Sequence, residues 1–180
     1  MISRRLAFIA LLVVPCVVWS QSPRMTQSLA SIGAGPFEFP IAGAFSVNRE
    51  GGATVFRTVD EKRRYTVGYF RNITSLPPGS ASAEQIAKLE TIVRANWERF
   101  AKQEKGQVVR AFKRVDVHGI AVFSMATEFL VGTQTQYYVQ FSASDGPRFA
   151  TIFAEGFGSA VGALQELEPL ILSVKIADGG

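Results

Sequence analysis

The sequence predicts an α+β protein in which an antiparallel sheet of about six or more strands packs with two main helices. Three observations carry this prediction. Segments 82–105 and 159–174 have apolar residues at the three- and four-residue spacing of helices. Several segments of alternating or continuous apolar residues are joined by turns of two or three residues, and such short turns join antiparallel neighbours. About 160 residues follow a predicted leader, which is enough chain for one core.

The first residues have the pattern of a secretory signal peptide, predicted over 1–20. Arg4 and Arg5 precede an apolar run at 6–18, and Ser20 supplies a small residue at its exit. We expect cleavage after Ser20 and export, with the periplasm favoured over the extracellular medium. The run of about 13 residues is shorter than the roughly 20 that span a bilayer, so a retained anchor is the less favoured alternative.

Cys16 is the only cysteine in the chain, and it lies inside the predicted leader. Lipidation of Cys16 is a second alternative, although the proline before it departs from the lipoprotein pattern. After cleavage the chain has no cysteine. Neither a disulfide framework nor a thiol nucleophile is therefore expected.

The charge balance is only mildly basic. The chain has 19 Lys and Arg against 15 Asp and Glu, a formal net charge of +4, and loss of the leader removes two of the arginines. No basic stripe with interleaved aromatic residues is present, so nucleic-acid binding is not expected. The densest basic spots are Lys62–Arg64 and Lys113–Arg114, each beside an acid. We interpret both as solvated hairpin ends.

Three parts are expected in the mature chain. Residues 21–36 are rich in Ser, Gly, Ala and Pro without a period, which is typical of a flexible N-terminal lead-in. A single α+β domain follows over 37–176, and 177–180 forms a frayed tail. The domain opens with the alternation Phe37–Ile41, a short edge strand because its proline cannot donate to a ladder.

The helix at 82–105 is the clearest element. Ser82 and Gln85 have the spacing of a capping box, and Gly106 marks the end. One apolar stripe runs along it, made of Ile86, Leu89, Val93, Trp97 and Phe100. We expect this stripe to pack on the protein's own sheet rather than to form a groove for a partner.

Six further strands are expected, at 53–59, 64–71, 107–117, 120–131, 134–143 and 147–154. The last four form a meander because only short turns separate them, at His118-Gly119, Gly132-Thr133 and Asp145-Gly146. The strand at 120–131 is apolar at nearly every position. It is therefore placed centrally, with a layer on both faces.

The final helix is expected to begin after Ser159, which can cap it. Its inner stripe is made of Val161, Leu164, Leu167, Ile171 and Val174. Pro169 interrupts the pattern and is expected to kink the helix or restart it as a new turn.

Few residues carry chemistry. His118 is the only histidine, so sites that need two or more imidazoles are disfavoured, and we interpret it as an exposed turn residue. The serines Ser124, Ser142, Ser144 and Ser159 have no Gly-x-Ser-x-Gly context. We predict no catalytic, cofactor-binding or metal-binding residues, no cofactor, and a binding site whose residues are unknown.

Three weaker patterns remain. Gly156-Phe157-Gly158 follows a strand and precedes a helix, where an anion could sit on the amides, but the third glycine of a nucleotide motif is missing. Glu128 and Glu155 fall on separate strands, and the sequence does not indicate that they face each other. Asn72-Ile73-Thr74 has the spacing of a glycosylation acceptor, which matters only in a glycosylating host.

The order of elements resembles the Mog/PsbP-like family, which includes exported bacterial DcrB-type proteins. The resemblance covers about residues 37 to 176. Its features are the start Phe37–Pro40, the Pro-Pro-Gly loop at 77–79, the long helix Ser82–Lys105, the hairpin Val115–Ala121 and a closing helix at Leu170–Lys175. The resemblance implies an α/β/α sandwich around an antiparallel sheet. It implies no single function, because one fold carries many.

The function expected from these observations is that of an exported, non-enzymatic accessory or binding protein. It would assist the assembly or stability of an envelope or membrane complex through a protein partner that the sequence does not identify. No stable membrane insertion is expected after loss of the leader. Two alternatives stay open: a carrier of a small apolar ligand, since 14 Phe could line a cavity, and an enzyme that uses carboxylates.

Overall fold

The computed structural model describes residues 26–50, 52–71, 73–74 and 82–177. The predicted leader, its cleavage site after Ser20 and Asn72 lie outside these residues. In chain order the elements are β1 (Thr26–Leu29), β2 (Ile32–Ala34), β3 (Phe37–Phe39), β4 (Gly43–Glu50), β5 (Ala53–Thr58), β6 (Arg63–Arg71), α1 (Ser82–Gln103), β7 (Gln107–Val117), β8 (Ile120–Val131), β9 (Gln134–Ser144), β10 (Arg148–Phe157), α2 (Ala160–Ile171) and β11 (Lys175–Ile176).

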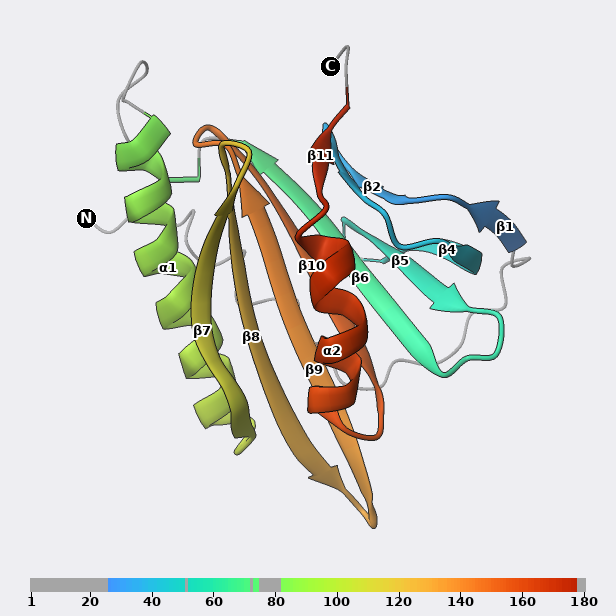
Figure 1. The fold of residues 1–180 in the computed structure, drawn as a ribbon. Coiled ribbons are helices and arrows are strands. Elements are labelled where there is room, and N and C mark those ends of the chain that lie inside the picture. Colours follow the sequence, from blue (N-terminus) through green and yellow to red (C-terminus); the bar gives the residue numbers. More distant parts are fainter. Residues whose placement is uncertain (1–25, 51, 72, 75–81, 178–180) are drawn as a thin grey trace.

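An eight-stranded sheet in the order β1-β4-β5-β6-β10-β9-β8-β7 forms the centre of the molecule (Figure 1). Every neighbouring pair is antiparallel. The meander β7–β10 is confirmed, and its first turn has positive φ at both His118 and Gly119, as a tight two-residue hairpin requires. A separate three-stranded sheet, β11-β3-β2, contains the expected strand at Phe37.

The two helices cover opposite faces of the large sheet, which confirms the α/β/α sandwich (Figure 1). One face of β8, with Phe123 and Met125, packs with α1, while the other face, with Val122 and Ala126, belongs to the core that includes α2. The two-sided burial predicted for β8 is therefore confirmed. The strand lies second from the β7 edge rather than at the centre.

The apolar stripe of α1 faces the sheet as predicted. Its buried residues are Ile86, Leu89, Val93, Trp97 and Ala101. Trp97 packs its ring on Phe112 and Phe153. Phe100 is only half-buried, because it lies near the C-terminal end of α1, where it contacts Phe129 and Tyr138 edge-on.

The expected cap of α2 is confirmed, since the Ser159 hydroxyl accepts hydrogen bonds from the amides of Val161 and Gly162. Three residues of the predicted stripe, Leu164, Leu167 and Ile171, are buried as expected, and the other two differ. Val161 is exposed, and Val174 is buried but lies beyond the helix. The helix continues through Pro169 and ends at Ile171, so the closing segment Leu170–Lys175 is not helical throughout.

The lead-in predicted at 21–36 is the main error in the fold. From residue 26 onward it forms β1 and β2, and Ile32 and Ala34 are buried in the main core. The apolar alternation of Ile32–Ala34 is only three residues long, and glycine and serine surround it, so it gave no clear strand signal. The chain reverses at Gly35, which has positive φ, and this reversal lets β2 pair with β3. At the other end, the amide of Ala177 donates to the carbonyl of Pro36, so the first residue of the expected tail is hydrogen-bonded, and residues 178–180 lie outside the described residues.

Candidate functional site

The sequence-predicted candidates are not brought together. His118 lies in the exposed β7–β8 turn, at the opposite end of β8 from Glu128 (Figure 1). The carboxylate of Glu128 lies on the α2 side and accepts a hydrogen bond from the amide of Ala160 at 2.7 Å. Glu155 is paired in register with Tyr138, on the α1 side, and forms an ion pair with Arg64. The two carboxylates are therefore separated by the sheet.

The four serines take structural roles or are buried in the sheet. Ser142 donates to the hydroxyl of Thr151 at 3.1 Å, and Ser144 donates to the carbonyl of Arg148 at 2.7 Å. Ser159 caps α2, and Ser124 is buried. These contacts fix the ends and faces of the sheet rather than prepare a nucleophile.

The Gly-x-Gly segment has a structural explanation. A Cβ built on Gly156 lies 2.6 Å from both the Lys62 carbonyl oxygen and the Tyr137 hydroxyl oxygen, so only glycine fits without displacing a neighbour. Gly158 has φ near 117°, which the turn into α2 requires. The amides at the start of α2, where an anion could bind, are occupied by Glu128 and Ser159 of the chain itself.

The basic spots are not the solvated hairpin ends that the sequence indicated. At Lys62–Arg64 only Lys62 is largely exposed, with 83% of its side chain accessible and an ion pair to Asp60, while the side chain of Arg63 is 18% exposed. Lys113 and Arg114 lie in the edge strand β7 and form ion pairs with carboxylates of Glu168, Glu90 and Asp116. Most of these partners come from distant parts of the chain, so local sequence gave no sign of them.

Arg63 organises a polar cluster that reaches the middle of α2. Its guanidinium donates to both oxygens of Glu166, at 2.7 and 2.8 Å, and to the hydroxyls of Tyr137 and Tyr65. The pairing raises the pKa of Arg63 and lowers that of Glu166. Burial raises the pKa of Tyr65. These hydrogen bonds and this ion pair therefore connect β6, β9 and α2.

Apolar side chains are exposed at one end of the sheet, which we call the hairpin end. It includes the β5–β6 turn, the start of β7, the β8–β9 turn, the end of β10 and the first turn of α2, and in Figure 1 its β8–β9 turn reaches beyond both helices. Among the described residues, the large hydrophobic side chains that are exposed all lie here: Val59, Val108, Leu130, Val131, Phe157 and Val161. Leu130 is 78% exposed and Phe157 60%.

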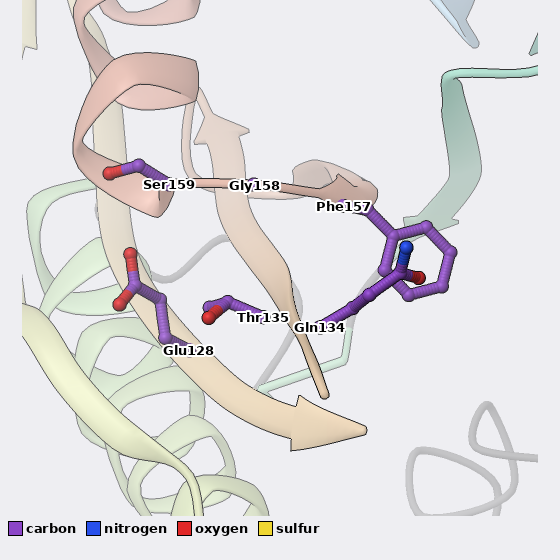
Figure 2. Close-up of a pocket in the computed structure, with 6 residues that line it drawn as sticks. All are labelled: Glu128, Gln134, Thr135, Phe157, Gly158 and Ser159. Atoms are coloured by element: carbon purple, nitrogen blue, oxygen red, sulfur yellow. The ribbon is translucent and has the colours of Figure 1, made fainter. Parts of the chain in front are cut away.

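Two shallow hollows meet at Phe157. The first, the tip hollow, has a volume of about 520 Å³ and is lined by Glu128, Gln134, Thr135, Phe157, Gly158 and Ser159. Figure 2 shows its Glu128 carboxylate pointing toward the start of α2, with the Phe157 ring on the opposite side.

The second, the side hollow, has a volume of about 410 Å³. Its lining consists of Thr58, Asp60, Lys62, Arg63, Tyr137, Phe157, Ser159, Gly162, Ala163 and Glu166. Phe157 and Ser159 line both hollows. Nothing in the sequence pattern brought these segments together, and the one local signal was a phenylalanine between two glycines.

Among the described residues, no three His, Cys, Asp or Glu side chains lie close enough together to hold a metal ion. No helix in the described ranges is both long and apolar enough to cross a membrane.

No family model matches the chain, and no curated protein matches its sequence. The solution structure of cyanobacterial PsbP (CyanoP) from Synechocystis sp. PCC 6803 superposes with a TM-score of 0.58 at 11% identity, over 91% of this chain and 98% of that one. The fold is PsbP-like. LpqN of Mycobacterium tuberculosis, involved in cell envelope biogenesis, gives a TM-score of 0.40 at 9% identity, over 87% of this chain and 86% of that one. At such identities the likeness concerns the PsbP-like fold alone.

Proposed function

We propose that this chain is an exported, non-enzymatic accessory protein that binds a protein partner through the hairpin end. In this role it helps an envelope or membrane complex to assemble or persist. The observation that carries the proposal is the concentration of exposed apolar side chains at one end of the sheet. These side chains lie on separate segments that meet at the same end of the sheet, and exposed apolar surface of this kind marks interaction sites.

The construction of the hairpin end supports binding rather than reaction. The polar groups nearest to its apolar side chains are already committed to internal bonds, as with Glu128 at the amide of Ala160 and Glu166 at Arg63. Such bonds hold the surface in one shape, and a surface that is already ordered loses less entropy when it binds. The predicted leader supports a site of action in the periplasm.

The PsbP-like fold agrees with this role without specifying it. The alternative of an apolar-ligand carrier receives less support, because the aromatic side chains between α1 and the sheet pack against one another. The ring centroids of Trp97 and Phe112, and those of Phe112 and Phe123, are 5.7 Å apart. These rings act as core, which accounts for them without a ligand.

The experiment compares two double variants of the full chain in the organism that encodes it. Leu130→Ser with Val161→Ser changes two exposed side chains of the hairpin end, whereas Lys88→Ser with Thr91→Ser changes exposed residues of α1. Both variants should melt within a few degrees of the wild type, because exposed substitutions change stability by only about 0.5 kcal/mol.

We expect the hairpin-end variant to lose the complex that the wild type forms in native envelopes and to fail to restore a deletion strain. The α1 variant should retain the complex and restore the strain. Normal complex formation by a folded hairpin-end variant would contradict the proposal.

A further inference from the structure

A different feature of the hairpin end points to a small-molecule class. Phe157 ends β10 with 60% of its surface exposed, and a hollow opens on each side of it. Gly156 and Gly158 flank it, and neither position tolerates a larger side chain freely, because the first lacks space and the second has positive φ. The phenyl ring is therefore presented on a backbone that is fixed on both sides.

The lining of both hollows is rich in oxygen and amide groups. The tip hollow offers the side chains of Glu128, Gln134 and Thr135, and the side hollow offers those of Asp60 and Glu166. A carboxylate that accepts one or two internal bonds keeps further lone pairs for hydroxyl donors. The exposed ring thus stands between two sets of hydrogen-bonding groups.

Several of these groups are held in place before any ligand arrives. Glu166 is gripped through both oxygens by Arg63, and Ser159 is held by the amides of α2. The amide of Lys62 donates to Asp60. Groups that are fixed in advance bind with a smaller loss of conformational freedom.

The charge of the hollows disfavours a strongly anionic ligand. Lys62 is paired with Asp60 and Arg63 with Glu166, so neither cation is left over, and the Glu128 carboxylate adds a negative charge. The Thr58 side chain lowers the pKa of Asp60, and Arg63 lowers that of Glu166, so both carboxylates are ionised at neutral pH. Phosphate or nucleotide groups would meet repulsion here.

We propose that the Phe157 site, made of the two hollows and the ring between them, binds an uncharged glycan chain. One sugar ring would stack its C–H face on Phe157, because the face of a phenyl ring carries partial negative charge and attracts such hydrogens. The hydroxyl and amide groups of the neighbouring sugars would bond to the oxygen and amide groups of the two hollows. A chain fits better than a single sugar, because polar groups lie on both sides of the ring.

This inference goes beyond the proposed function and shares only its location. The two ideas fail separately, because docking of a protein partner is tested at Leu130 and Val161, neither of which lines a hollow. The glycan site is tested at Phe157 with purified protein and no partner.

The test is a titration of the purified, isotopically labelled chain with two neutral oligosaccharides, tetra-N-acetylchitotetraose and maltotetraose, followed by NMR. We expect at least one of them to shift the amide signals of Gln134, Thr135 and Ser159 in a saturable way. Phe157→Ala should weaken that binding about three- to tenfold, as expected for the loss of one stacking contact. Val161→Ala, which removes exposed apolar surface outside both hollows, should leave the affinity unchanged.

Three results would overturn the inference. The first is the absence of saturable shifts with either oligosaccharide at concentrations into the millimolar range. The second is binding that shifts signals elsewhere and leaves those of the two hollows unmoved. The third is equal affinity of Phe157→Ala and the wild type. Phe157 is largely exposed, so its replacement should leave the fold intact, and a thermal melt of the variant checks this.

Discussion

Replacing Gly156 by alanine tests whether the Gly-x-Gly segment is structural. A Cβ at this position lies 2.6 Å from the Lys62 carbonyl oxygen and 2.6 Å from the Tyr137 hydroxyl oxygen. The carbonyl belongs to the backbone just before β6, so it moves less readily than a side chain. Tyr137 therefore has to shift, and its hydroxyl accepts a 2.8 Å hydrogen bond from Nε of Arg63.

The expected loss of stability has two parts. Forcing an extra carbon into a packed interior costs about 1–3 kcal/mol. Losing a hydrogen bond to a charged group costs about 1.5–3 kcal/mol. Both parts would not reach their upper limits together, since the movement that relieves the contact is the one that breaks the bond. We expect Gly156→Ala to lower the free energy of unfolding by about 3 kcal/mol.

Urea unfolding followed by far-ultraviolet circular dichroism measures this change. Gly162→Ala is the matched control, because Gly162 lies in α2 and, its chain neighbours and the helix's own backbone aside, no atom lies within 4 Å of the added Cβ. The control should raise stability by about 0.5–1 kcal/mol, the usual gain for alanine over glycine in a helix. A loss below about 1 kcal/mol for Gly156→Ala would refute the reasoning that close contact fixes this glycine.

Three further predictions concern other parts of the fold. Trp97→Ala should lower stability by about 3–5 kcal/mol in the same assay, while Glu98→Ala on the exposed side of α1 should stay within about 0.5 kcal/mol; equal small losses would mean that the stripe does not hold α1. Because Arg63 lowers the pKa of Glu166, this ion pair stabilises the fold above the unfolded value of 4.5 and is lost as pH falls through the lower folded value. Melts of Glu166→Gln should therefore decline less steeply with acid than those of the wild type, and parallel curves would contradict this. His118→Asn should leave stability within about 0.5 kcal/mol, because asparagine also accepts the positive φ of this turn; a lost envelope phenotype with an unchanged melt would place His118 in a functional site.

Local patterns predicted the meander and α1 well. The turns at His118-Gly119 and after Val131 are so short that the strands they join must pair antiparallel. The observed bounds of β7 and β8 are those expected. The period of α1 places Trp97 on the sheet without knowledge of what it contacts. Short turns and helical periodicity can be predicted from sequence because the residues that determine them lie within a few positions of each other.

The errors arose where the cause lies far along the chain. Ile32 is buried because β2 pairs with β3 and packs into the main core, which its glycine-rich surroundings conceal. Arg63 is fixed by Glu166, about a hundred residues away, so its run of basic residues resembled a solvated turn. The hairpin end and the Phe157 site exist only after separate turns meet in the fold, and the sequence offered no spacing from which to infer them.

The most direct test of the central claim is photo-crosslinking in native envelopes. A photoreactive amino acid placed at Leu130, at the exposed end of β8, should form a discrete adduct with a partner protein. The same amino acid at Lys88, on the exposed side of α1 and away from the hairpin end, should form none. An adduct at Lys88 with none at Leu130 would show that the partner contacts another face and would contradict the account.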